Sequence, residues 1–321
     1  METLKQFYTF GPVPSRRLGR SLGINNIPAK ICTYTCIYCQ IGKTLKMQVK
    51  REGFFKPEEI ANEVVLKIGE TEKSGETIDY LSFVPDGEPT LDKNLGIHLE
   101  YLKRFKIKTA VITNSSLMGE RGVREDLSRA DWVSVKVDAI DDSVWRKIDR
   151  PHRSLKLESI NEGLLEFSRN YRGKLVTETM LVAGINDSET ELEKIANFIT
   201  QLKPDTAYIS IPTRPPAEKW VEPPNEDRIN KAYLVFKERA INTELLIGYE
   251  GNAFATTGDV EKDILSITSV HPMREDAIEE YLKKTGANWE SIEKLIREGF
   301  LIRLTYNGKN FYLRKLKKKF K

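Results

Sequence analysis

The feature that most constrains the fold is a regular alternation of short apolar runs with amphipathic helical stretches, from about residue 21 to residue 211. The apolar runs are rich in β-branched residues and end close to Pro, Gly, Asn or Asp, as buried strands do. The expected strands cover residues 77–84, 107–113, 132–137, 175–182 and 207–211, with an earlier one near Ser21–Asn25. This spacing predicts an α/β fold with a parallel sheet, either doubly wound or curved into a barrel.

The stretches between these runs carry helix signals. Pro57 stands in the first turn of one expected helix, where its missing N–H costs nothing. Ser188 and Glu191 have the spacing of a capping box ahead of another. A helix at about Asp227–Ala240 and a strand at Glu244–Tyr249 are expected to end this region.

The pattern changes in the last quarter of the chain. From Asp259 it predicts helix, helix, turn, helix and hairpin, with a helix end at Thr285-Gly286 and a type I′ turn at Asn307-Gly308. Three helices and a two-stranded wing resemble a winged-helix domain. We therefore expect two domains, residues 1–254 and residues 255–321, the second ending in a basic tail.

The composition excludes a membrane-spanning chain of the helical kind. Hydrophobic residues make up 40% and charged residues 31%, and no apolar run approaches the ~20 residues that span a bilayer. The stretch METLKQFYTFGPVPSRR lacks the apolar core of a signal peptide. We expect a cytoplasmic protein with no membrane partner. The net charge of +4 is too small to indicate nucleic-acid binding by itself.

All three cysteines lie in the stretch ICTYTCIYCQ, as Cys32, Cys36 and Cys39, with C-x₃-C-x₂-C spacing. Three clustered cysteines cannot form a complete disulfide framework, and in a reducing compartment they indicate metal or redox chemistry. A structural zinc needs a fourth ligand, and a histidine distant in sequence keeps that alternative open. A [4Fe–4S] cluster with only three cysteine ligands leaves one iron open to another molecule.

The arrangement Cys32-x₃-Cys36-x-Tyr38-Cys39, just after the first strand of an α/β chain, is similar to that of the radical S-adenosylmethionine (SAM) superfamily. The resemblance implies a partial (β/α)₆ TIM-type barrel and one [4Fe–4S] cluster whose open iron binds SAM. It also implies reductive cleavage of SAM to a 5′-deoxyadenosyl radical, which abstracts hydrogen from a substrate. An external one-electron donor, a ferredoxin or a flavodoxin, is the implied partner.

A second motif, Val84-Pro85-Asp86-Gly87-Glu88-Pro89-Thr90, ends the second expected strand. It resembles the family's Gly-Gly-Glu segment, whose backbone and carboxylate hold the amino group of SAM. Asp86 replaces the first glycine, so Gly87 and Glu88 are the matching positions. The alternative interpretation is a strand-ending turn with a solvated glutamate.

Other polar residues follow the later strands and are candidates for contact with SAM. Asn114 and Ser115 are placed to bind ribose hydroxyls, or to cap a helix. Lys136 and Asp138 lie two residues apart, hence on one face of a strand, where burial is costly unless they are paired or functional. A structural ion pair is the alternative.

Two more candidates complete the expected cofactor site. Tyr38 is the aromatic residue before the last cysteine, and Arg214 follows the sixth strand, where it could bind the SAM carboxylate or an anionic substrate. Near the N-terminus, Arg16, Arg17 and Arg20 either bind an anion at the barrel entrance or cover the rim through salt bridges.

Four segments resemble the group that includes the wyosine-type tRNA-modifying synthases: FGPVPSRRLGRSLGIN, Asp86–Thr90, Arg150-Pro151-His152 and Arg214-Pro215-Pro216. Those enzymes carry additional cysteines for a second cluster, which this chain lacks. Wyosine synthesis itself is therefore not expected, and tRNA modification with an RNA or other anionic substrate stays as an alternative.

A second alternative is a non-enzymatic Fe–S redox regulator that binds nucleic acid through its winged helix. The run Arg314–Lys321, with six basic residues in eight, suits contact with a polyanion. Glu290 and Glu293 in the third expected helix oppose contact with phosphates. We therefore favour a packing or substrate-presenting role for this domain.

Overall fold

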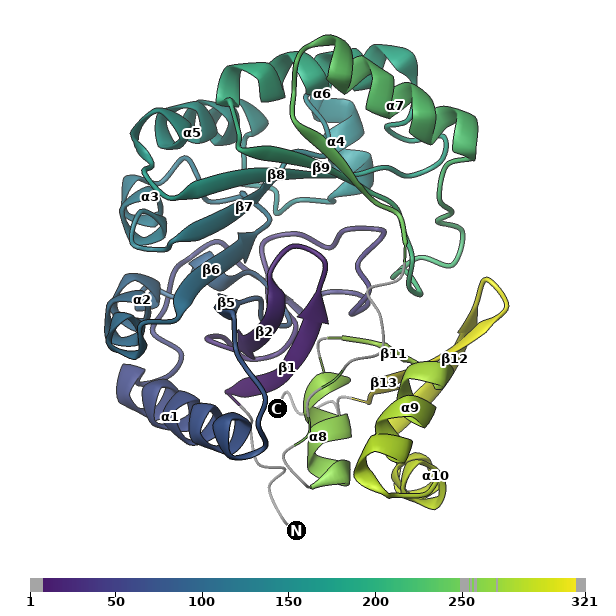
Figure 1. Ribbon diagram of the computed structural model, residues 1–321. Helices are drawn as coiled ribbons and strands as arrows, with labels where there is room; N and C mark the ends of the chain where they lie inside the picture. Colours follow the sequence, from purple (N-terminus) through teal and green to yellow (C-terminus); the bar gives the residue numbers. More distant parts are fainter. Residues whose placement is uncertain (1–7, 249–253, 255, 257–258, 270, 316–321) are drawn as a thin grey trace.

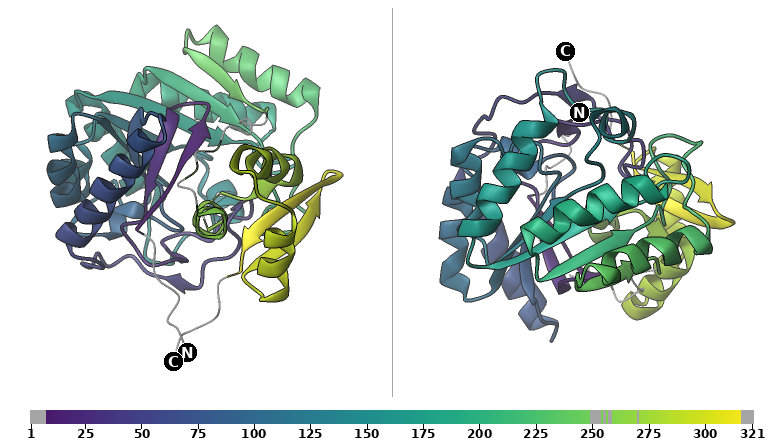
Figure 2. Two further views of the ribbon diagram at one scale, coloured as in Figure 1. Left: turned by 60° about the horizontal axis from the view of Figure 1, so that its bottom comes forward. Right: turned by 90° about the horizontal axis from the view of Figure 1, so that it is seen from above.

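The computed structural model describes residues 8–248, 254, 256, 259–269 and 271–315 (Figure 1). Its main element is an eight-stranded sheet in the order β1-β2-β5-β6-β7-β8-β9-β10. The strands are β1 Thr9–Ser15, β2 Gly19–Ile24, β5 Tyr80–Phe83, β6 Lys108–Thr113, β7 Trp132–Lys136, β8 Lys174–Met180, β9 Thr206–Ser210 and β10 Thr243–Leu246. β1 is antiparallel to β2, and every other neighbouring pair is parallel. The sheet is curved and does not close between β1 and β10, so it forms a partial barrel (Figures 1 and 2).

Helices connect the parallel strands and cover the outer face of the curved sheet (Figures 1 and 2). They are α1 Pro57–Lys73, α2 Leu95–Leu102, α3 Arg121–Leu127, α4 Asp142–Ile148, α5 Leu157–Asn170, α6 Glu189–Leu202 and α7 Glu226–Glu238. The six expected parallel strands are confirmed to within about three residues at each end. The expected β10 joins them as a seventh parallel strand of the same sheet.

Local signals explain where several helices begin. Pro57 stands in the first turn of α1, as expected. The Ser188 side chain caps α6 by accepting a hydrogen bond from the Glu191 backbone N–H. Asn225 caps α7 in the same manner, through the N–H of Arg228. These caps use backbone N–H groups that have no partner inside the helix.

β1 was not expected from the sequence, because its stretch TFGPVPS contains a glycine and two prolines, which disfavour strands. It is an edge strand, and an edge tolerates residues without an N–H donor. The turn between β1 and β2 places Leu18 among the inward-facing side chains Ala110, Trp132 and Val176 at the amino end of the barrel. This end of the barrel is therefore filled by apolar side chains.

The last quarter of the chain forms α8 Val260–Ile267, β11 Met273–Arg274, α9 Glu275–Thr285, α10 Glu290–Arg297, β12 Leu301–Tyr306 and β13 Lys309–Arg314. The strands form a separate antiparallel sheet in the order β11-β13-β12. The expected turn at Asn307-Gly308 joins β12 to β13, with positive φ at both residues. The short strand β11 was not expected. Most of the basic run, residues 316–321, lies outside the described residues.

This C-terminal unit packs on the N-terminal edge of the barrel (Figure 1). Phe10 and Val13 of β1 share one apolar core with Phe254 and Ile264. Ser266 on α8 donates a 3.1 Å hydrogen bond to the carbonyl of Thr9. The barrel edge and the C-terminal unit are thus joined by apolar and polar contacts. Within the described chain, no helix is both long and apolar enough to cross a bilayer.

Candidate active site

The cysteine loop lies at the carboxyl ends of the barrel strands, where backbone hydrogen bonds hold it in place. It begins with the short strand β3 Ile31–Cys32, which pairs with β4 Lys46–Met47. The N–H of Ile37 donates to the carbonyl of Ile148 at 2.9 Å. The N–H of His152 donates to the carbonyl of Thr33, also at 2.9 Å. The expected segment Arg150-Pro151-His152 therefore runs beside the cysteines.

The surroundings of the three thiols favour their protonated form as long as no cation is bound. Desolvation by the surrounding protein raises the pKa of all three, that of Cys32 to about 12 with a further contribution from the charge of Glu88. Such thiols ionise at neutral pH when a cation binds them, because coordination removes the proton. Three soft thiolates are ligands suited to iron–sulfur clusters. The residues present thus fit the cluster.

The histidines have other partners. His98 Nε2 lies 2.9 Å from the carboxylate of Asp92, and His152 Nδ1 lies 2.8 Å from the hydroxyl of Ser154. Among the described residues, no group of three or more His, Cys, Asp or Glu side chains is placed to hold a single metal ion. The fourth ligand that a structural zinc needs is thus not found in the described part of the chain.

Glu88 is buried, only 1% exposed, so the interpretation as a solvated glutamate is wrong. Its Oε1 atom accepts hydrogen bonds from the hydroxyls of Thr90 at 2.5 Å and Thr113 at 2.6 Å, and its Oε2 atom accepts one from the N–H of Asn114 at 2.8 Å. This carboxylate therefore ties the segment after β5 to the end of β6.

Gly87 lies against the cysteine loop and can only be a glycine there. Its φ of +151° is in a region that L-residues rarely adopt. A Cβ atom at this position would lie 2.0 Å from the carbonyl oxygen of Ile31. This close approach allows a backbone hydrogen bond to the cysteine loop. The N–H of Glu88 donates to the carbonyl of Ile31, the residue before Cys32, at 3.2 Å.

Asn114 and Ser115 differ in what they reach. The Asn114 side-chain amide lies 3.5 Å from Cys32 Sγ and donates to Thr33 Oγ1 at 2.9 Å, so it faces the cysteine loop. The Ser115 hydroxyl accepts a hydrogen bond from the N–H of Lys136 at 2.8 Å and is buried. Asn114 is thus at the site, whereas Ser115 links β6 to β7.

Tyr38 connects the cysteine loop to the interior of the barrel. Its hydroxyl donates to Asp138 and lies 3.2 Å from Asp149 Oδ1, which also accepts from Cys36 Sγ at 3.3 Å. The Lys136 ammonium lies 4.9 Å from the centre of the Tyr38 ring and 3.6 Å from Asp138 Oδ1. The expected pair Lys136 and Asp138 therefore exists, on the inner side of the barrel and next to the cysteines.

The ionic network extends deeper into the barrel. Lys136 lies 3.3 Å from Glu178, which also pairs with Arg17 from the turn between β1 and β2. Burial opposes the ionisation of Glu178, but Lys136 and then Arg17 lower the pKa of this carboxyl to about 2. Arg17 thus forms an internal salt bridge, and Arg20 pairs with Glu76, as the structural interpretation of these arginines expected.

Arg214 is buried between the cysteine loop and the C-terminal unit. Its guanidinium donates to the Gln40 side chain at 2.6 Å and lies 3.1 Å from the imidazole of His271. Gln40 directly follows Cys39. Arg214 therefore joins the last cysteine to the unit that packs on the barrel edge.

Three functional candidates were missed in the sequence. Asp149 contacts both Cys36 and Tyr38, and only its place before Arg150-Pro151-His152 could have indicated it. Lys30 and Asp86 form a buried pair, with Lys30 Nζ 3.6 Å from Asp86 Oδ1. The sequence signal for this pair was the replacement of a family glycine by Asp86, with a lysine two residues before Cys32.

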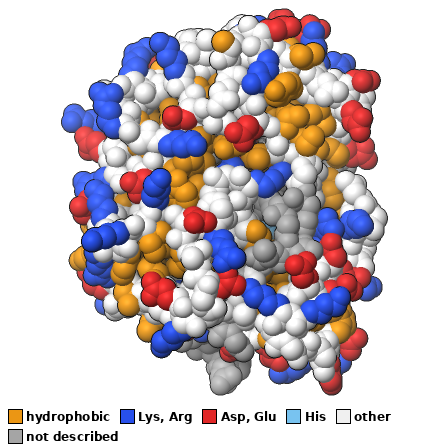
Figure 3. All heavy atoms as spheres, in the orientation of Figure 1, with side chains coloured by type: hydrophobic (Ala, Val, Ile, Leu, Met, Phe, Trp, Pro, Cys, Tyr) orange, Lys and Arg blue, Asp and Glu red, His pale blue; other side chains and the backbone are white. Residues whose placement is uncertain are grey.

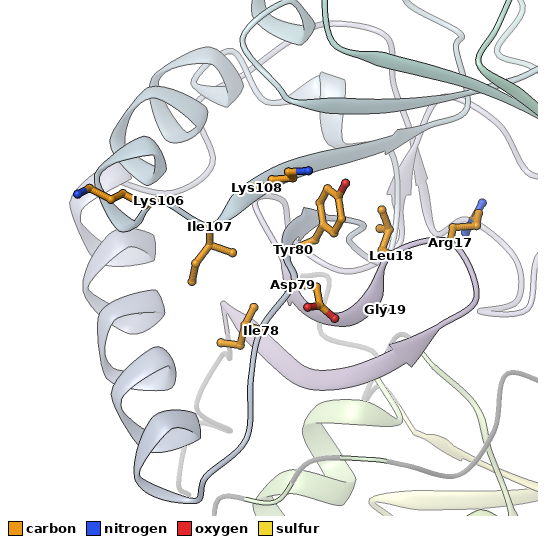
Figure 4. A pocket seen from close by; sticks show the side chains of 9 residues that line it. All are labelled: Arg17, Leu18, Gly19, Ile78, Asp79, Tyr80, Lys106, Ile107 and Lys108. Carbon is orange, nitrogen blue, oxygen red and sulfur yellow. The ribbon is translucent and has the colours of Figure 1, made fainter.

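Two hollows lie at opposite ends of the strands. A small one of about 20 Å³ is lined by Asn114, Lys136, Asp138 and Asp149 among others, beside the cysteine loop. A larger one, of about 530 Å³, lies at the amino ends of β2, β5 and β6 and is lined by Leu18 and Tyr80 among others (Figure 4). Enzymes built on barrels carry their sites at the carboxyl ends of the strands, so we assign the site to the cysteine end.

The fold and the cysteine loop together define an enzyme class. The sequence matches the radical SAM superfamily over residues 26–199, and the chain belongs to this superfamily. Enzymes of this superfamily use a [4Fe–4S] cluster and SAM, which are the two cofactors expected from the sequence.

Particular relatives extend the comparison. The chain is 48% identical to UPF0026 protein MJ1312 of Methanocaldococcus jannaschii, over 96% of both chains. It is 36% identical to a UPF0026 protein of Helicobacter pylori (strain ATCC 700392 / 26695), over 71% of this chain and 73% of that protein. Its fold is similar to that of TYW1 with a lysine–pyruvate adduct bound, with a TM-score of 0.54, 19% identity, and coverage of 68% of this chain and 73% of that chain.

Proposed function

We propose that this enzyme binds one [4Fe–4S] cluster through Cys32, Cys36 and Cys39 and cleaves SAM reductively. The bound cofactors would supply a 5′-deoxyadenosyl radical that abstracts hydrogen from the substrate. The observation that supports this most is the meeting of three strand-end motifs at one place. The cysteine loop, the Gly87 segment and Asn114 all lie within hydrogen-bond contact of one another.

The residues around the loop have separable proposed roles. Gly87 lets the backbone approach, and Glu88 holds two strand ends in the geometry that receives the amino group of SAM. Asn114 and Ser115 orient the ribose side, Asn114 by contact and Ser115 through the backbone of β7. Tyr38, Lys136 and Asp138 form the polar wall toward the barrel interior.

Arg214 is the proposed anion-binding residue of the site. It is buried and carries its positive charge next to Gln40 at the end of the cysteine motif. A carboxylate or phosphate group would complement this charge. We assign to it the carboxylate of SAM or an anionic group of the substrate.

The test is anaerobic reconstitution with iron and sulfide, followed by incubation with SAM and dithionite. We expect 5′-deoxyadenosine in the wild type, and neither visible cluster absorption nor product in Cys36→Ala. Lys43→Ala is the matched control, since Lys43 lies in the same loop with 63% of its side chain exposed. A fully loaded wild-type protein that forms no 5′-deoxyadenosine would overturn the proposal.

The proposal includes partners and a location. A ferredoxin or flavodoxin would supply the electron, in the cytoplasm. The substrate class to test first is RNA, as in the alternative of a tRNA-modifying enzyme, which the resemblance of four sequence segments to the wyosine-type tRNA-modifying synthases supports. RNA that copurifies with the anaerobic protein and increases the yield of 5′-deoxyadenosine would identify this class. Nuclease treatment should then remove both the RNA and the increase.

We further propose that residues 255–321 form a winged-helix domain that packs on the barrel of residues 1–254. The strand order β11-β13-β12 around three helices supports it. The third helix, α10, exposes Glu290 and Glu293, and the exposed Glu298 directly follows it; these carboxylates repel phosphates. Over the face seen in Figure 3, basic and acidic side chains are interspersed. These charges favour a packing role over that of a regulator that binds DNA. Salt-dependent duplex binding by the full chain would reverse this preference.

A further inference from the structure

Lys30 and Asp86 form a buried ion pair that the roles above do not use. The side chains are 11% and 7% exposed, and Lys30 Nζ lies 3.6 Å from Asp86 Oδ1. Within the described part of the chain, neither Lys30 Nζ nor Asp86 Oδ2 has a hydrogen-bond partner. A buried pair with unsatisfied polar atoms is costly, so its presence calls for a functional explanation.

The backbone fixes this pair beside the last cysteine. The N–H of Lys30 donates to the carbonyl of Asp86 at 2.7 Å, and Lys30 has a φ of +65°. The N–H of Gly42 donates to the carbonyl of Cys39 at 3.0 Å and closes a turn. Lys30 Nζ lies beside this turn, 3.7 Å from the position that a Cβ atom on Gly42 would take. The ammonium therefore lies under the Cys39–Gly42 turn.

The charges of the pair act on Cys39 in opposite directions. Burial raises the pKa of the Cys39 thiol most, the Lys30 ammonium lowers it, and the Asp86 carboxylate raises it to a smaller extent. A group that stabilises negative charge at a thiolate also stabilises the reduced state of a cluster bound there, because reduction adds one negative charge. The net field of the pair at Cys39 is positive.

We propose that Lys30 and Asp86 set the reduction potential of the cluster, Lys30 raising it and Asp86 opposing this effect. The inference rests on the proposed cluster at Cys32, Cys36 and Cys39. It assigns a function to the departure of Asp86 from the family's glycine. Hydrogen bonds and net charge near the sulfurs are known determinants of cluster potential.

The test is potentiometry of the reconstituted full-length protein without SAM, followed by electron paramagnetic resonance of the reduced cluster. At pH 8.5 Asp86 is ionised, because burial raises its pKa only to about 7. Asp86→Asn should shift the potential upward, and Lys30→Met should shift it downward. The double variant should lie between the two single variants and below the wild type, because the net field of the pair is positive.

Controls separate charge from structure. Lys30→Arg keeps the charge and should keep the potential, and Lys43→Met removes an exposed charge of the same loop and should leave it unchanged. Lys30→Gln is a second neutral variant if Lys30→Met does not fold. Iron and sulfide analysis confirms that each variant carries a full cluster before its potential is compared.

Two results would overturn the inference. Potentials that do not move, or that move in the same direction in Asp86→Asn and Lys30→Met, exclude an electrostatic role. A loss of SAM affinity with an unchanged potential of the SAM-free cluster would show that the pair serves the amino-acid part of SAM instead. In either case the proposed function stands as long as the wild-type protein binds a full cluster. A wild-type protein that binds no cluster would overturn the proposed function itself.

Discussion

The hydroxyl of Tyr38 lies 3.2 Å from Asp149 Oδ1 and also donates to Asp138, so one phenol bridges two buried carboxyl groups. Burial raises the pKa of both carboxyls, and that of Asp149 is raised further by the charge of Asp138. The phenol and Lys136 are what make this pair of acids tolerable beside the cysteines.

Removal of this hydroxyl is expected to destabilise the protein. Tyr38→Phe leaves buried acceptors with one donor fewer, which costs about 1–3 kcal/mol. Urea unfolding under reducing conditions measures the change. Tyr233→Phe on the outer helix α7 is the control and should change the free energy of unfolding little. Equal stabilities of the two variants would contradict the bridge.

Glu178 gives a prediction about pH. Its pKa is lowered from 4.5 to about 2 in the folded protein, so the folded state favours the ionised form. The resulting stabilisation is present above pH 4.5 and is lost as the pH falls towards 2. Glu178→Gln should therefore lower the free energy of unfolding by about 3 kcal/mol at pH 7.

The difference between wild type and Glu178→Gln should become smaller between pH 4.5 and pH 3. Urea unfolding at several pH values measures it. Glu166→Gln on α5 removes a carboxylate that is 58% exposed and serves as the control. A difference that stays constant across this range would show that Glu178 acts through packing rather than charge.

Gly87 gives a prediction about backbone space. Gly87→Ala would place a Cβ atom 2.0 Å from the Ile31 carbonyl oxygen, and backbone must move to remove this clash. Gly184→Ala also introduces a side chain at positive φ, but no atom lies within 4 Å of its Cβ position. We expect a loss of about 1 kcal/mol at Gly184 and a markedly larger loss, or insoluble protein, at Gly87. Thermal unfolding compares the two, and similar melting temperatures would argue against the close contact.

Arg214 gives a prediction about the contact between the barrel and the C-terminal unit. Arg214→Leu removes the hydrogen bonds to Gln40 and His271. Hydrogen exchange followed by mass spectrometry should show faster exchange around His271, which follows α8, and in residues 36–42, because both segments lose Arg214 as a partner. Arg239→Leu at the end of α7 is the control and should change exchange only locally. Unchanged exchange around His271 would show that the other contacts between the unit and the barrel hold it without Arg214.

The parts of the fold that follow from hydrophobic periodicity could be predicted from the sequence. Strands such as Trp132–Lys136 alternate between outward Val133 and Val135 and inward Trp132, and they are flanked by turn residues. β1 could not be predicted, because its stability comes from pairing with β2 and from packing on α8. The glycine and the prolines hide the strand from its local sequence, and the contact with α8 joins segments far apart in the chain.

The same distinction applies to the site. The cysteine spacing and Gly87-Glu88 are local motifs and could be found by reading the chain. Asp149 and the pair of Lys30 and Asp86 acquire their meaning from contacts between residues 56 to 113 positions apart. Charged residues are common in any sequence. These three stand out only because the fold buries them beside the cysteines, where their charges act strongly.

The contact between Ser266 and Thr9 joins residues that are 257 positions apart. A ribosome adds residues at 5–20 per second, so the apolar face of β1 waits roughly 13–50 s for its covering helix. Throughout synthesis, Phe10 and Val13 therefore remain accessible to chaperones and to other chains. Truncation before α8 would leave this edge strand permanently open to aggregation.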